Sequence, residues 1–149
     1  MADGLKAQIR EELTAALRAG DKTRLASLRM LTAAITHREK ELRHELSDAE
    51  VREVAGREVK KRSESIEAFD AAGRTELADR ERAEREILQV FAPEQLDDAA
   101  MDALIDEALA ETGATSAKDM GKVMGFVMGR AKGAVDGAVV QRKVTARLD

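Results

Sequence analysis

A single proline interrupts a chain whose other segments favour helices. Pro93 is the only proline among 149 residues. Because the residue before a proline is driven out of the helical conformation, a helix that approaches Pro93 must end before it. Aromatic residues make up only 2% of the chain, and charged residues make up 36%, against about 25% in an average domain. Such a chain buries a core most readily with amphipathic helices. We therefore predict an all-α fold with domains at 1–92 and 93–149.

Apolar residues recur at every third or fourth position on both sides of Pro93, as expected for helices with one buried face. In the first helix, this pattern predicts that Leu5, Ile9, Leu13 and Leu17 face inward. Residues that commonly cap or begin helices predict an N-terminal arm or bundle of about four helices, starting near Leu5, Asp21, Ser47 and Thr75. Three more helices are expected to start near Asp97 or Asp98, Ser116 and Asp136. Ser47 with Glu50 and Ser116 with Asp119 have the spacing of a capping box.

Charge is unevenly distributed after Pro93. Residues 94–111 contain seven acidic residues and no basic one, whereas residues 115–148 contain seven basic residues and two acidic ones. The second domain is therefore predicted to have one acidic helix and two basic helices. A net charge of −4 argues against nucleic acid coating the whole chain. The basic helices are the better candidates for binding an anionic partner.

Several classes of site are excluded or disfavoured. The absence of cysteine excludes disulfides and thiolate chemistry. His37 and His44 lie about two turns apart on one helix, and two histidines alone make a poor metal site. No serine stands beside a base in a recognisable catalytic arrangement. We expect no metal, no cofactor and no catalytic centre in the chain. No apolar run reaches the about 20 residues of a membrane helix, so we expect no membrane association and a cytoplasmic location.

Five glycines recur at every fourth residue near the C-terminus: Gly121, Gly125, Gly129, Gly133 and Gly137. On a helix, the first three lie along one stripe. The favoured interpretation is close packing of a second helix against this stripe. Another interpretation is that a phosphate backbone approaches it, with Lys122, Arg130 and Lys132 alongside. The stripe is not a P-loop, because the Lys-Ser/Thr ending and the preceding strand are missing.

A second basic cluster consists of Lys60, Lys61 and Arg62. Glu58 and Glu64 flank it, so a solvated helix face is the favoured interpretation and RNA binding the other. The alternating charges of residues 79–86 likewise indicate a solvated face or, alternatively, a partner surface.

Eight segments in order along nearly the whole chain resemble the YqeY family. The strongest is KDMGKVMG at 118–125. The others are KKRSESIEAF at 60–69, AGR at 72–74, EIL at 86–88, PEQL at 93–96, TGA at 112–114, KG at 132–133 and DG at 136–137.

The C-terminal half of that family is similar to the tail domain of GatB, a subunit of the glutamine-dependent amidotransferase that acts on mischarged tRNA. This resemblance implies a small three-helix C-terminal domain that contacts tRNA. It also implies a relation to carbon–nitrogen ligases with glutamine as amide donor. The serine–lysine centre of the amidase subunit and the nucleotide-binding cradle of GatB have no counterpart in this sequence.

Three functional hypotheses remain from the sequence. The first is a non-catalytic module that binds tRNA or another RNA, with candidate contacts at Lys118, Gly121, Lys122, Gly125, Arg130, Lys132, Arg142 and Lys143. The second is a protein adaptor or accessory subunit that docks to an amidotransferase or an aminoacyl-tRNA synthetase. The third is amidotransferase activity within a complex. The acidic helix argues against the first unless it faces away from the RNA.

Overall fold

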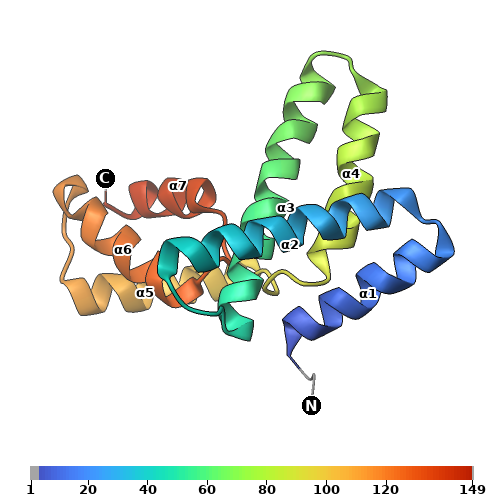
Figure 1. The fold of residues 1–149 in the computed structure, drawn as a ribbon. Coiled ribbons are helices and arrows are strands. Elements are labelled where there is room, and N and C mark those ends of the chain that lie inside the picture. The colour runs from blue at the N-terminus through green and yellow to red at the C-terminus, as the bar shows by residue number, and fades with distance from the viewer. Residues whose placement is uncertain (1–3, 149) are drawn as a thin grey trace. The chain divides into compact units, whose positions relative to one another are not determined.

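The computed structural model describes residues 4–148, which form seven α-helices and one 3₁₀ turn, without a strand among them (Figure 1). The predicted all-α fold is therefore confirmed. Contacts within the chain define two compact units, Met1–Pro93 and Glu94–Asp149. We call them the N-terminal unit and the C-terminal unit. The division falls after Pro93, one residue later than in the sequence prediction.

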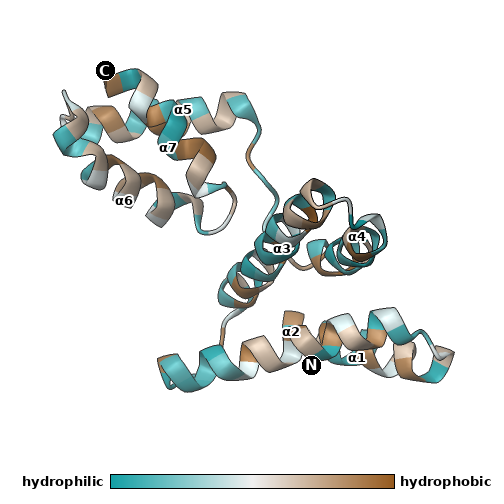
Figure 2. Cartoon of the chain, turned by 90° about the horizontal axis from the view of Figure 1, so that it is seen from above, coloured by the Kyte–Doolittle hydropathy of each residue, from teal (hydrophilic) through white to brown (hydrophobic). Residues whose placement is uncertain are grey.

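The N-terminal unit consists of four helices in two layers. The helices are α1 (Leu5–Ala19), α2 (Lys22–Leu42), α3 (Asp48–Ala71) and α4 (Thr75–Gln89). Helices α1 and α2 form one layer, and the α3–α4 hairpin packs across it (Figure 2). The centre of this core is made by side chains with no exposed surface: Leu28, Leu31, Val51, Leu88 and Phe91.

Asp21 and Ser47 cap α2 and α3 as predicted, whereas the residues just before α1 and α4 provide no side-chain cap. The Asp21 side chain accepts a hydrogen bond of 3.1 Å from the backbone N–H of Arg24 at the start of α2. Ser47 and Glu50 exchange bonds of 3.2 and 3.0 Å, so the capping box of α3 is confirmed. These bonds satisfy N–H groups that have no partner inside a helix. They also fix where each helix begins.

Leu17 corrects the predicted inward face of α1. Its side chain is 56% exposed, whereas Ala16 is buried. Residues four apart on an α-helix drift by about 40° per step, so three steps carry Leu17 about 120° away from Leu5. Ala16 stays within about 20° of Leu5 by the same geometry. The four-residue spacing therefore predicted the first part of this face correctly and failed at its end.

The C-terminal unit has α5 (Asp98–Thr112), a 3₁₀ turn (Ala117–Asp119), α6 (Met120–Ala131) and α7 (Gly137–Leu148). Its core is small and mainly β-branched, with Ile105, Val123, Val127, Val140 and Val144 fully buried. Asp97 caps α5 as expected, accepting from the N–H of Ala100 at 2.7 Å.

The predicted capping box of Ser116 and Asp119 is present, but it begins a 3₁₀ turn that precedes α6. The Asp119 carboxylate accepts bonds from the N–H groups of Thr115 and Ser116, at 2.9 and 3.3 Å. These two bonds stabilise the charged carboxylate and lower the pKa of Asp119. They close a tight turn, so Met120 is the first residue of the α-helix proper.

Candidate functional site

The three glycines of α6 lie on an exposed face of the helix. Gly121, Gly125 and Gly129 are all exposed, and a Cβ atom built on any of them would meet no atom within 4 Å. No other segment of the C-terminal unit packs against them. Within the C-terminal unit, the favoured prediction of close helix–helix packing is therefore wrong. Gly137 differs, because a Cβ there would lie 3.6 Å from Cε of Met128.

Three lysines lie beside this stripe. Lys118 in the 3₁₀ turn and Lys122 in the first turn of α6 flank the start of the stripe, and Lys132 caps the helix at its end. All three are exposed. We call the surface formed by Lys118, Gly121, Lys122, Gly125, Gly129 and Lys132 the glycine face of α6. Its lysines form no ion pair with any other described residue, although Lys122 is near enough to contribute to the lowered pKa of Asp119.

The acidic helix α5 is paired with basic residues of the same unit. Lys143 Nζ lies 2.9 Å from Asp98 and 2.8 Å from Asp102. Arg147 is paired with Asp106. These bonds connect α7 to α5, and the two carboxylates raise the pKa of Lys143. Three of the five acids of α5 are thus paired with two cations of α7, and the helix keeps a net negative charge.

Arg130 is also held inside the unit. Its guanidinium pairs with Glu107 at 2.8 Å and lies over the ring of Phe126, with Cζ 4.7 Å from the ring centroid. Together with Lys143 and Arg147, it is one of three predicted basic residues whose charge an α5 acid already neutralises. Such a cation is a weaker candidate for binding phosphate, because the ligand would have to displace a carboxylate.

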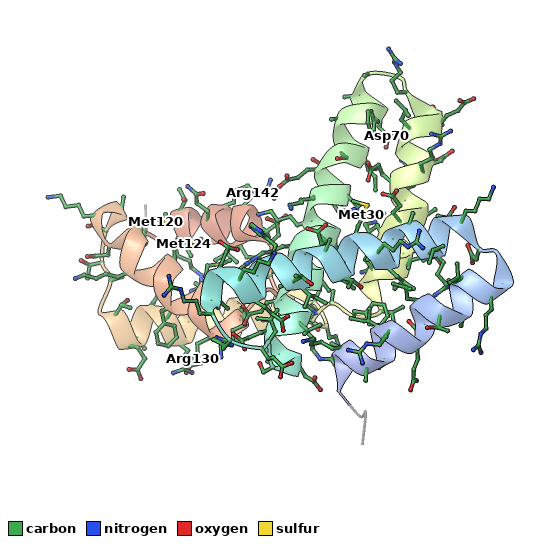
Figure 3. All side chains as sticks on the ribbon, viewed as in Figure 1. Met30, Asp70, Met120, Met124, Arg130 and Arg142 are labelled. Atoms are coloured by element: carbon green, nitrogen blue, oxygen red, sulfur yellow. The ribbon has the colours of Figure 1, made fainter. Side chains whose placement is uncertain are left out.

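The seven basic residues of this unit do not form one continuous patch. Arg142 forms no ion pair with a described residue and lies on the outer face of α7, beside Ala138, Gln141 and Thr145. Arg130 and Arg142 are on opposite sides of the unit in Figure 3. Of the predicted residues, Lys118, Lys122 and the glycines therefore lie together on α6 and the turn before it, with Lys132 at the other end of α6, whereas Arg142 lies on the outer face of α7.

Arg62 is not part of an exposed basic cluster, as the sequence had suggested. Its side chain is only 4% exposed and lies between α3 and α4 in the N-terminal unit. Nη1 is 2.9 Å from Oε1 of Glu58, and Nε is 3.6 Å from Oε2 of Glu84. Only Lys60 and Lys61 reach solvent, and Lys61 is paired with Glu58 at 3.0 Å. The cluster interpretation failed because a neighbouring helix supplies the carboxylate that lets Arg62 be buried.

The network around Arg62 includes a second carboxylate of α4. The pKa of Glu81 is raised, mainly because its side chain is partly withdrawn from water and also because Glu84 lies beside it. Nη2 of Arg62 also lies 3.3 Å from the sulfur of Met30 on α2. The alternating charges of residues 79–86 are thus only partly solvated, since some of them face α3. The signal available in the sequence was the four-residue spacing of Glu58 and Arg62.

The raised pKa of Glu81 predicts a specific pH dependence. The folded state binds this proton more tightly than the unfolded chain, so the free energy of unfolding falls as pH rises from the ordinary value of 4.5 through the raised one. Glu81→Gln is expected to remove that loss. In urea unfolding followed by circular dichroism, the variant should unfold at higher urea than the wild type at pH 7 and at equal urea near pH 4. Glu86→Gln on the exposed side of α4 is the control; an equal gain there would contradict the assignment.

The described residues contain no group of three or more His, Asp and Glu side chains placed to hold a metal ion. Nor does any helix in residues 4–148 combine the length and apolar character that a membrane crossing requires. Among the surfaces of the described residues, the glycine face of α6 is the most distinctive.

The structural class is an all-α protein of two units. The first contains a helical hairpin, and the second is small and carries the exposed glycine helix α6. The sequence matches the YqeY family, described as Yqey-like protein, over residues 6–148, and the chain belongs to this family. It is also similar to an uncharacterized protein of Schizosaccharomyces pombe. The two are 30% identical over 90 residues, which cover 60% of this chain and 73% of the yeast protein.

Proposed function

We propose that this protein binds structured RNA, with tRNA the expected class, by placing the glycine face of α6 against the phosphate–ribose backbone. The protein acts in this proposal as a binding module and not as the catalyst of amide transfer. The observation that carries the proposal is the exposed stripe of Gly121, Gly125 and Gly129, against which nothing in the C-terminal unit packs.

The stripe has an energetic cost that no contact inside the chain offsets. A glycine in a helix interior is less favourable than alanine by about 0.5–1 kcal/mol, because it loses more backbone freedom on folding. Three such positions lie on one short helix. A stripe without side chains does, however, let a partner come closer to the helix backbone than any other residue would. This geometry suits a function that requires close approach.

The charges beside the stripe favour a phosphate backbone as that partner. Lys118 and Lys122 are exposed at one end and Lys132 at the other, and none of them forms an ion pair with a described acid, although the Asp119 carboxylate lies near Lys122. Double-stranded RNA is recognised largely through phosphates and 2′-hydroxyls along its wide minor groove, which admits a protein surface without reading sequence. Four of the five acids of α5 pair with Arg130, Lys143 and Arg147, which lowers the net charge of this helix surface from −5 to −2 and weakens its repulsion of RNA.

Reversing the charge of the two lysines at the start of the stripe tests this proposal. Lys118→Glu with Lys122→Glu is expected to weaken binding of fluorescently labelled tRNA about tenfold or more at 50 mM KCl. It should also lower the slope of log affinity against log salt by about 2, because each phosphate contact contributes about 0.9. Fluorescence anisotropy at several salt concentrations measures both quantities. Acidic residues near a helix N-terminus are favourable, so the variant should stay folded.

The matched control is Arg74→Glu with Arg80→Glu, which changes the net charge equally on exposed residues of the N-terminal unit. Its affinity should stay within about twofold of the wild type. Equal weakening by both variants would show a general charge effect and contradict a site on α6. Absence of wild-type binding at 50 mM KCl would refute RNA binding. Recovery of an amidotransferase or synthetase subunit after nuclease treatment, with RNA binding absent, would instead support the adaptor hypothesis.

A further inference from the structure

The side of α2 that faces away from the core carries a row of basic residues. On a helix with about 3.6 residues per turn, Lys22, Arg29 and Lys40 fall within about 20° of one line. The buried residues Leu31 and Ile35 lie on the opposite side of the helix. Between the cations stand Ala26 and Ala33, exposed and small. We call Lys22, Ala26, Arg29, Ala33 and Lys40 the basic row of α2.

No acidic residue belongs to this row. The nearest acids on the helix, Glu39 and Glu41, project about 100° away from it on either side. Glu39 is occupied by Lys6 of α1, at 2.7 Å, and by the backbone N–H of Leu46. Glu41 lies between Arg38, at 3.8 Å, and His37, at 3.6 Å. The three cations of the row form no ion pair with another described residue, so their charge is available to an external partner.

The row departs from the charge pattern of the rest of the N-terminal unit. Residues 1–93 contain nearly equal numbers of both signs, 19 acidic and 18 basic residues. The exposed side of α4, for comparison, mixes both signs, with Glu76, Asp79, Arg80 and Glu86. The strongly hydrophilic part of α2 near its C-terminal end is visible in Figure 2. An ordinary solvated face in this chain would carry acids as well, so the basic row requires a separate explanation.

We propose that the basic row of α2 is a second RNA contact, which binds the phosphate backbone of a duplex region without reading its sequence. Its cations span about 27 Å, taking 1.5 Å per residue over 18 residues. A duplex carries dense phosphate charge along its axis, one per about 1.7 Å in B-form DNA, so cations spaced along a line are attracted to it in any register. The small alanines let the backbone approach between the basic side chains. The inference extends the proposed RNA binding to a surface in the other unit.

Two other partners fit the row less well. Helices that lie on a membrane insert large apolar side chains between their basic residues, and this row has only alanines there. Protein interfaces are usually centred on aromatic, methionine or arginine side chains and are depleted in lysine. Met30, at the margin of the row, is 46% exposed, and its sulfur contacts Nη2 of Arg62. Charge complementarity therefore favours a polyphosphate.

Arg29→Glu with Lys40→Glu tests the inference in the full chain. We expect about a tenfold loss of affinity for a labelled 20-base-pair RNA hairpin at 50 mM KCl, and a salt slope lower by about 2. Arg74→Glu with Arg80→Glu should change the affinity less than about twofold. The exposed positions of the row contribute no ion pair, so the thermal unfolding curve measured by circular dichroism should remain cooperative. If the charge reversal disturbs folding, Arg29→Gln with Lys40→Gln replaces it. This variant is expected to lose affinity for the hairpin to a smaller extent.

The outcomes separate this inference from the function proposed for α6. Wild-type affinity in both α2 variants, with binding lost in Lys118→Glu with Lys122→Glu, would refute the row and leave the glycine face intact. The converse result would refute the glycine face and support the row. Absence of RNA binding by the wild type would refute both. Binding to vesicles containing anionic lipid, abolished by the α2 variants while RNA binding is unchanged, would assign the row to a membrane surface instead.

Discussion

Arg62→Ala is expected to destabilise the α3–α4 hairpin by about 3–5 kcal/mol. The change removes the cation from a site where Glu58 is only 7% exposed and Glu84 faces the same interior. Removing one partner of a buried ion pair leaves the other charge neither hydrated nor paired. The resulting loss of folding free energy exceeds the net contribution of the pair to stability. Hydrogen exchange followed by mass spectrometry should show faster exchange in peptides from α3 and α4. Peptides from the C-terminal unit provide an internal reference.

Arg82→Ala is the matched control, because Arg82 also connects α4 to α3, through Asp70, but is 39% exposed. An exposed pair contributes only about 0–1 kcal/mol, so exchange in the hairpin should change little. Replacing Glu58, Arg62 and Glu84 together by leucine, methionine and leucine should restore most of the lost stability, because no charge then remains buried. Equal effects of Arg62→Ala and Arg82→Ala would contradict the assignment of Arg62 to the interior.

Local sequence signals were sufficient for most of the fold. Helix starts at Asp21, Ser47 and Asp97 follow from hydrogen bonds between residues three apart, and these need no knowledge of the tertiary structure. The all-α class follows from periodicity and from the low aromatic content. Leu17 shows the limit of a four-residue spacing as a guide to the buried face. Because the helix has 3.6 residues per turn, the angular error grows over three turns.

The candidate sites depended on tertiary contacts that a linear pattern does not contain. Whether a lysine or arginine is available to a ligand is decided by which acid lies opposite it. Lys143 is neutralised by two acids from more than 40 positions away, whereas Lys122 is not. The sequence predicted that Arg62 is a surface residue, because Glu84, which lies beside it in the structure, belongs to the next helix. Similarly, the exposure of the glycine stripe could not be told from close packing without knowing what lies against α6.

Gly125→Leu is expected to have opposite effects on stability and on binding. The glycine is exposed, its backbone is helical, and an added Cβ meets nothing within 4 Å, so leucine should stabilise α6 by about 0.5–1 kcal/mol. The same side chain would stand between the helix and any backbone that approaches the stripe. We expect affinity for tRNA to fall about tenfold while the midpoint of urea unfolding rises, measured by anisotropy and circular dichroism on one preparation.

Ala103→Leu on the exposed side of α5 is the control for an added leucine and should leave tRNA affinity unchanged. A protein that is both more stable and fully able to bind tRNA would show that close approach to Gly125 is not required. A loss of both stability and binding would show that the stripe is packed within the protein after all, contrary to the structure.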